Sequence, residues 1–315
     1  MQIPLNVSIL ICTYNRADSL GITLQSLSGV IVPKGVTLET LIVDNNSKDG
    51  TREIVERFNE NYKYNLKYIL EAEQGLSSAR NAGLKEATGD IILFTDDDVL
   101  VDPAWLTEIV HAFCSYNADC VGGKILPVWP CERPSWLTRK IEGNIALLDY
   151  GEGTFEIEDE NRLLFGANIA FSRRILQRVG CFDTSLGRKG DKLYSHEDKE
   201  LYKRVIQAHG KVIYSSRAII HHIIGMHRTR KSYFRKWHFD DGEFHGIQLG
   251  NYDKRNIFGI PFYIIRGFIE ISKKYLISML SLNSEMCFID ELNVCNSLGF
   301  MNGRLKLYFG KDPKY

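Results

Sequence analysis

Strand patterns and helical patterns alternate through the first hundred residues of this chain, and no other feature constrains its fold as strongly. Short apolar runs bounded by turn residues predict strands at residues 7–12, 39–43, 67–70 and 90–94. Between them, helical spacing predicts helices that begin near residues 18, 51 and 75. Because this alternation favours parallel strands with right-handed crossovers, we expect an α/β fold with a Rossmann-like, mostly parallel sheet flanked by helices.

Three of these four strands end in polar residues. Thr13 follows the first strand, Asp44 follows the second, and the triplet Asp96 to Asp98 follows the fourth. In open α/β sheets, ligands bind beyond the carboxyl ends of the strands. We therefore expect these polar groups to converge on one crevice.

The acidic triplet is the strongest indication of chemistry in that crevice. Three carboxylates held at one strand end repel one another, and a divalent cation would remove that cost. Carboxylate oxygens suit Mg²⁺ or Mn²⁺ far better than they suit soft metals. The structural alternative is a solvated acidic turn with a helix N-cap.

Other residues near the strand ends suit a nucleotide. Asp44 can accept a hydrogen bond from the N–H of a base, and Tyr14 can stack on the face of that base. Arg80, near the start of a predicted helix, can pair with a phosphate or with the acidic triplet. Each also has a structural interpretation: Asp44 as an Asx-turn or helix cap, Tyr14 as core packing, and Arg80 as a surface residue. Their places at matching strand ends favour the functional interpretation.

The composition argues against several classes of protein. The 39 basic and 39 acidic residues cancel, which disfavours nucleic acid as the main partner. Seven scattered cysteines without a C-x-x-C pair indicate neither a disulfide framework nor a zinc site. No signal-peptide pattern opens the sequence, and no uninterrupted apolar run reaches the roughly 18 residues needed to cross a bilayer. We therefore expect a reduced, cytoplasmic setting.

Four segments together resemble the motifs of glycosyltransferase family 2, whose members have the GT-A fold. They are residues 12–16 (CTYNR), 43–51 (VDNNSKDGT), 75–83 (GLSSARNAG) and 96–98 (DDD). The resemblance extends over residues 5–240. The Walker loop and the G-x-G-x-x-G signature of other nucleotide-binding folds are both missing from the sequence.

This resemblance implies roles for individual residues. It assigns nucleotide binding to Thr13, Tyr14, Arg16, Asp44, Arg80, Asp96 and Asp97. It also implies that Asp98 ligates a Mn²⁺ or Mg²⁺ ion that bridges the two phosphates. Because the leaving nucleotide diphosphate gains negative charge, such an ion would stabilise it as a Lewis acid.

A second group of motifs follows the triplet. Glu197 and Asp198, after a basic glycine loop at residues 187–192, resemble the E-D motif of the family at a helix start. By this resemblance, Asp198 is the base that takes the proton of the acceptor hydroxyl, and Glu197 helps to orient a sugar. Alternative bases are Glu197 and then Asp191, and the structural interpretation is that the pair only supplies favourable first-turn charge.

The resemblance extends to a histidine beyond this motif. Relatives carry a metal-binding histidine some 20 to 25 residues after the E-D pair, and His222 aligns best with it. His221 is the second choice, and a purely structural histidine pair is the alternative.

The C-terminal part of the chain is predicted to be helical. Residues 228–237 are basic and interleaved with aromatics, which is compatible with a solvated helix face, a segment closing over a diphosphate, or contact with anionic lipid. Residues 257–280 show an amphipathic helical pattern. We therefore expect a GT-A domain at 1–240, divided into a nucleotide-binding half (1–125) and an acceptor and catalytic half (126–240), with a helical extension at 241–315.

The expected activity follows from the resemblance. It is a metal-dependent, inverting transfer of a sugar from a nucleotide diphosphate sugar, with UDP as the nucleotide, to a glycan or lipid-linked acceptor in polysaccharide or glycoconjugate biosynthesis. Peripheral contact with the inner face of a membrane fits such an acceptor. The alternative from another class is a nucleotide-sugar-binding protein without turnover.

Overall fold

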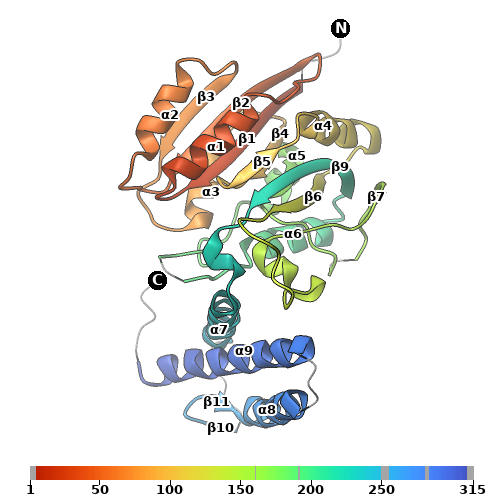
Figure 1. The fold of residues 1–315 in the computed structure, drawn as a ribbon. Helices are drawn as coiled ribbons and strands as arrows, with labels where there is room; N and C mark the ends of the chain where they lie inside the picture. The colour runs from red at the N-terminus through yellow and green to blue at the C-terminus, as the bar shows by residue number, and fades with distance from the viewer. Residues whose placement is uncertain (1–4, 160, 191, 250–254, 281–283, 311–315) are drawn as a thin grey trace. The chain divides into compact units, whose positions relative to one another are not determined.

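A computed structural model describes residues 5–159, 161–190, 192–249, 255–280 and 284–310 of the chain (Figure 1). The chain divides into two compact units. The sheet unit, as we call the first, comprises the described residues within 1–129, 146–190 and 196–224. The helical unit comprises those within 130–145, 191–195 and 225–315. The domain division at residue 240, which the sequence suggested, stays a prediction.

A nine-stranded sheet forms the centre of the sheet unit, with strands in the order β3-β2-β1-β4-β8-β6-β9-β5 and β7 paired to β9. Its strands are β1 (Leu5–Thr13), β2 (Val36–Asp44), β3 (Asn65–Leu70), β4 (Ile91–Thr95), β5 (Val99–Val101), β6 (Cys120–Val128), β7 (Thr154–Glu156), β8 (Asn168–Ser172) and β9 (Val212–Ile223). The four N-terminal strands of this order, β3 to β4, run parallel.

The rest of the sheet mixes directions. Strand β8 lies between β4 and β6 and runs antiparallel to both, whereas β6 and β9 are parallel. Strand β5 continues the chain just after the acidic triplet and pairs antiparallel with the end of β9. This pairing determines which side chains lie beside the triplet.

Helices cover the sheet, and the first three begin where the alternating pattern predicted. They are α1 (Ala17–Leu27), α2 (Thr51–Asn59), α3 (Leu76–Glu86), α4 (Trp105–Tyr116), α5 (Arg173–Val179) and α6 (Glu197–Gln207). Helix α1 buries Leu20, Leu24 and Leu27, which recur at the spacing of one helical face. The expected mixed α/β fold with helices around a mostly parallel sheet is confirmed.

The helical unit contains the expected C-terminal helices. Its elements are the 3₁₀ helices η1 (Arg139–Ile145) and η2 (Met226–Thr229), the helices α7 (Lys231–Gln248), α8 (Phe262–Leu280) and α9 (Ser284–Tyr308), and the short strands β10 (Asn256–Ile257) and β11 (Ile260–Pro261). Within this unit, Trp136 packs edge-on against the rings of Phe234 on α7 and Phe288 on α9, with ring centroids 5.2 and 5.0 Å apart.

Helices α7 and α9 cross at glycines. A Cβ atom added to Gly242 on α7 would lie 1.9 Å from the carbonyl oxygen of Asn296, and one added to Gly299 on α9 would lie 1.9 Å from that of Phe239. Both distances are far below van der Waals contact, so the two backbones approach closely only because side chains are missing there.

Among the described residues, no helix combines the length and the apolar character needed to cross a membrane.

Candidate functional site

The strand register brings the predicted polar residues to one edge of the sheet. Thr13, at the end of β1, is directly paired with Asp44 at the end of β2. On the other side of β1, Ile11 is paired with Thr95, the last residue of β4 before the acidic triplet. Because all three strands are parallel, their polar ends lie at the same edge, as the sequence suggested.

Arg16 bridges two carboxylates of the triplet. Its Nη1 lies 2.9 Å from Asp97 Oδ1 and 2.8 Å from Asp98 Oδ2. The hydroxyl of Thr13 donates a hydrogen bond of 2.8 Å to the other oxygen of Asp97. Arg16 and Thr13 thus hold the triplet in place, and their assignment to nucleotide binding stays a prediction.

His222 lies beside the third aspartate of the triplet. Val99 on β5 is paired with His222 on β9, and Ile223 N donates to the carbonyl oxygen of Asp98 at 2.8 Å. This pairing places His222 Nε2 3.2 Å from Asp98 Oδ1. His221, the second choice from the sequence, is paired with Leu100 one residue farther along β5.

This donor pair fits a hard divalent cation. Both side chains are buried, with His222 1% and Asp98 7% exposed. Two neighbouring ligands about 2.1 Å from an octahedral ion lie about 3.0 Å apart, close to the separation of the imidazole nitrogen and the carboxylate oxygen. Carboxylate and imidazole together suit Mn²⁺ well. These residues therefore meet the geometric requirement for two ligands of one ion.

Asp44 is oriented by its neighbours at the end of β2. Its Oδ1 accepts from Ser47 N at 2.8 Å, and its Oδ2 accepts from the hydroxyl of Tyr68 at 2.7 Å. The first bond has the form of the Asx-turn that the sequence left open. Each carboxylate oxygen keeps a further lone pair, so this turn leaves Asp44 able to accept from a base. Tyr14 is 44% exposed, which leaves its ring accessible for stacking.

Arg80 is buried between the two carboxylates of the E-D motif. Its Nη1 lies 3.0 Å from Glu197 Oε1 and also pairs with Asp198 Oδ1. The guanidinium lies over the ring of Phe182, 5.1 Å from its centroid. The interpretation of Arg80 as a surface residue is wrong, because the residue is only 4% exposed. It links α3 to the start of α6 inside the sheet unit.

Asp198 is held from two sides and remains accessible. Gly166 N donates to its Oδ2 at 2.9 Å, whereas Arg80 pairs with its Oδ1. A Cβ atom at Gly166 would lie 2.4 Å from Arg80 Nη2 and 2.5 Å from Asp198 Oδ2, so a larger residue there would displace one of these two side chains. The Asp198 side chain is 23% exposed. The carboxylate is therefore fixed in orientation and still open to a ligand.

Two carboxyl groups of the site titrate at raised pKa values. Burial raises the pKa of Glu197 to about 7, and the charge of Asp198 adds to this effect while Arg80 opposes it. Burial likewise raises the pKa of Asp97 to about 6, against the opposing charge of Arg16. Within the described residues, Glu197 Oε2 is buried without a hydrogen-bond partner. Such groups are expected where charge is handled during a reaction.

The basic glycine loop begins against the N-terminus of α3. Leu76 N donates to the carbonyl oxygen of Arg188 at 3.1 Å, and the hydroxyl of Ser77 donates to that of Leu186 at 2.8 Å. Asp191, the second alternative base, lies outside the described residues.

Sequence reasoning missed two contributors to the site. Tyr68 orients Asp44 from the neighbouring strand, and only the register of β2 and β3 reveals this contact. Gly166 lies beside the paired Arg80 and Asp198, and this role depends on long-range packing. A glycine two residues before Asn168 was the sole signal in the sequence.

Comparison with known proteins identifies a family model that matches the chain. The model described as "Glycosyl transferase family 2" matches residues 8–180. Among curated proteins, the chain is 30% identical over 232 residues to the glucosyl-dolichyl phosphate glucuronosyltransferase of Haloferax volcanii. The aligned region covers 71% of each of the two chains.

Solved structures share the fold at lower identity. The mannosyltransferase PcManGT from Pyrobaculum calidifontis, in complex with GDP-Man and Mn²⁺, superposes with a TM-score of 0.57 at 18% identity, over 96% of this chain and 75% of that one. S. aureus TarS 1–349 in complex with UDP gives a TM-score of 0.56 at 17% identity, over 99% of this chain and 93% of that one. Of a longer TarS chain, the match spans 41%.

Proposed function

Since this chain belongs to glycosyltransferase family 2, whose model covers more than half of it, we propose that it is a metal-dependent, inverting enzyme that uses a UDP-sugar. The sequence was correctly identified as a glycosyltransferase of GT-A fold. The acceptor in this proposal is a glycan or a lipid-linked sugar in polysaccharide or glycoconjugate biosynthesis. A relative named for a dolichyl phosphate substrate is in keeping with a lipid-linked acceptor.

One observation carries the proposal: two separate sets of charged residues converge on the same sheet edge. The first set is the Asp98 and His222 pair, with donor atoms 3.2 Å apart. The second is Asp198, held by Arg80 and Gly166 at the start of α6. A transfer needs both sets, because the leaving nucleotide diphosphate gains negative charge and the acceptor hydroxyl must lose a proton.

Each residue has a defined task in the proposed reaction. Asp198 accepts the proton of the acceptor hydroxyl while that oxygen bonds to the anomeric carbon and the bond to the nucleotide diphosphate breaks. Attack from the face opposite the leaving group inverts the anomeric centre. Arg80 fixes the Asp198 carboxylate, and Asp44 accepts a hydrogen bond from the N–H of the nucleobase. Asp98 and His222 would hold a divalent ion, which would supply Lewis-acid stabilisation of the diphosphate.

UDP is the nucleotide that we propose, with support from the likeness to TarS, whose structure holds UDP. Asp44 is also suited to a guanine N–H, and the structure of PcManGT holds GDP-Man. A donor panel separates these possibilities directly.

The test is the release of nucleotide diphosphate from UDP-, GDP- and dTDP-sugars, measured with Mn²⁺, with Mg²⁺ and after EDTA treatment. We expect metal-stimulated release of UDP, and faster release once a suitable acceptor is added. Tight UDP binding without release from any donor would instead establish a binding protein without turnover. A preference for a GDP- or dTDP-sugar would overturn only the choice of nucleotide.

A further inference from the structure

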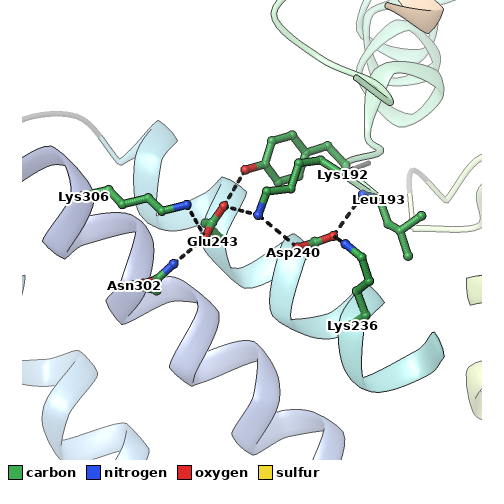
Figure 2. Close-up of polar contacts among 8 residues, drawn as sticks. Lys192, Leu193, Lys236, Asp240, Glu243, Asn302 and Lys306 are labelled. Carbon is green, nitrogen blue, oxygen red and sulfur yellow. Dashed lines mark hydrogen bonds and ion pairs between the residues drawn. The ribbon is translucent and has the colours of Figure 1, made fainter. Parts of the chain in front are cut away.

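Two buried carboxylates on α7 hold the segment that leads into the E-D motif (Figure 2). Asp240 and Glu243 are 2% and 1% exposed. Lys192 Nζ lies 2.6 Å from Glu243 Oε1 and 3.3 Å from Asp240 Oδ1, and the hydroxyl of Tyr194 donates to the same Glu243 oxygen at 2.8 Å. The backbone N–H of Leu193 donates to Asp240 Oδ2 at 3.1 Å. Three consecutive residues are thus bound to one helix.

The other oxygen of Glu243 is bound by α9. Lys306 Nζ lies 2.9 Å from Glu243 Oε2, and the amide of Asn302 donates to that oxygen as well. Burial alone would raise the pKa of Glu243, but the hydrogen bonds from the two lysines and the tyrosine lower it to about 2. The carboxylate is therefore charged at neutral pH, and its partners compensate for its removal from water.

The segment held by α7, residues 192–194, lies just before the E-D motif. Only Ser195 and His196 separate Tyr194 from Glu197 and Asp198. Helix α6 begins at Glu197, so the direction in which the chain enters that helix influences where its first side chains point. Asp240 and Glu243 belong to the helical unit, whereas the nucleotide-binding residues predicted from the sequence belong to the sheet unit.

We propose that Asp240 and Glu243 are positioning residues for the sugar transfer, which hold Lys192, Leu193 and Tyr194 so that the first turn of α6 presents Asp198 to the acceptor. This inference rests on the proposed function and adds a role for the helical unit. Loss of the contact misplaces the base and leaves the nucleotide site intact. A displacement of about 1 Å in a reacting group can slow turnover about 10²-fold.

Two lysines give a matched pair of variants. Lys192→Met and Lys306→Met each remove one ammonium group from Glu243, and the two side chains are similarly exposed, at 36% and 33%. Lys192 lies on the segment before α6, whereas Lys306 lies on α9. Both variants remove a cation that pairs with Glu243, and Lys192→Met also removes one that pairs with Asp240. A purely structural role therefore predicts losses of activity that follow the losses of stability.

We expect Lys192→Met to lower kcat for transfer by about tenfold or more, with the donor KM and the UDP affinity in Mn²⁺ unchanged. Lys306→Met should lower the melting temperature by a comparable amount and keep kcat within about twofold of the wild type. Lys192→Arg retains the charge and should recover most of the lost kcat.

Amide hydrogen exchange gives a readout that does not depend on turnover. In Lys192→Met, the amides of residues 197–200 should exchange faster than in the wild type, whereas Lys306→Met should leave them unchanged. Equal kcat values for the two methionine variants, with equal exchange at residues 197–200, would overturn the positioning role alone. A wild type without metal-stimulated turnover on any donor would overturn the proposed function, and this inference with it.

Discussion

At the scale of single residues, Arg80 decides how the proposed base is presented. It binds both Glu197 and Asp198, so two adjacent carboxylates share one buried cation. Sharing a cation holds Asp198 in one orientation, and the partial exposure of its side chain leaves room for an acceptor hydroxyl. Glu197, which is almost fully buried, is in a poorer position to meet an acceptor.

Asp198→Asn tests this assignment with little change in shape. Transfer should fall by about 10²–10⁴-fold, the usual contribution of a positioned base. UDP affinity in Mn²⁺ should stay near that of the wild type, because the residues proposed to bind the metal and the nucleobase are unchanged. Glu200→Gln is the control, since it also removes an acidic residue from the first turn of α6. If Asp198→Asn transfers sugar at the wild-type rate, the base is another group, with Glu197 the first alternative.

The raised pKa of Glu197 makes stability depend on pH. Because burial raises this pKa to about 7 in the folded protein, the folded state binds more protons than the unfolded state between the ordinary glutamate value and pH 7. The stability from this group is complete below pH 4.5 and is lost as the pH rises towards 7. Through this group, the free energy of unfolding of the wild type should therefore fall by on the order of 1–3 kcal/mol as the pH rises from 4.5 to 7. Glu197→Gln should not show this decrease.

Denaturant unfolding of the metal-free protein at pH 5 and pH 7.5 measures this effect. The free energy of unfolding of the wild type minus that of Glu197→Gln should be smaller at pH 7.5 than at pH 5. A difference that grows with pH would mean that the Glu197 pKa is lowered, in the way of an ordinary ion-paired carboxylate.

At the scale of elements, the crossing of α7 and α9 depends on bare backbone. Gly242 and Gly299 leave no room for a methyl group, because the nearest atoms are backbone oxygens that cannot rotate away. Gly246 and Gly303, four residues farther along each helix, repeat the close approach, with an added Cβ 2.2 and 2.3 Å from backbone oxygens. Glycine is costly inside a helix, so this pattern indicates that packing decided these positions.

Gly242→Ala should therefore destabilise the protein by roughly 1–3 kcal/mol, the usual cost of overpacking, although alanine is the better helix former. Gly267 on α8 is the control, since a Cβ there would meet nothing within 4 Å. Gly267→Ala should stabilise the protein by about 0.5–1 kcal/mol. Urea unfolding of both variants measures the two effects, and two effects of the same sign would contradict the close crossing.

At the scale of the whole molecule, the sequence predicted the parallel strands and the residues at their ends because both signals are local. Apolar runs and the polar residues that follow them are read within about ten positions. The neighbour of Asp98 is a different matter. His222 was reached through a resemblance, and the physical cause of its position is the pairing of β5 with β9, more than a hundred residues apart in sequence.

The C-terminal helices were expected from a local pattern, but the other segments of the helical unit and its buried charges could not be anticipated. Asp240 and Glu243 look like solvent-facing residues of a basic helix, yet both are buried against partners from distant segments. Residues 130–145 and 191–195 carry no helical periodicity that would assign them to the C-terminal helices. Their assignment requires three-dimensional packing, such as the contact of Trp136 with Phe234 and Phe288.

The interleaved composition of the helical unit limits how this enzyme can be recombined with its relatives. A chimera that exchanges only the C-terminal part, from residue 225 onward, would pair Trp136 with foreign rings and Lys192 with a foreign helix. A graft that respects the structure has to carry three segments of the chain at once. A chimera with a single crossover point would therefore break contacts inside the helical unit.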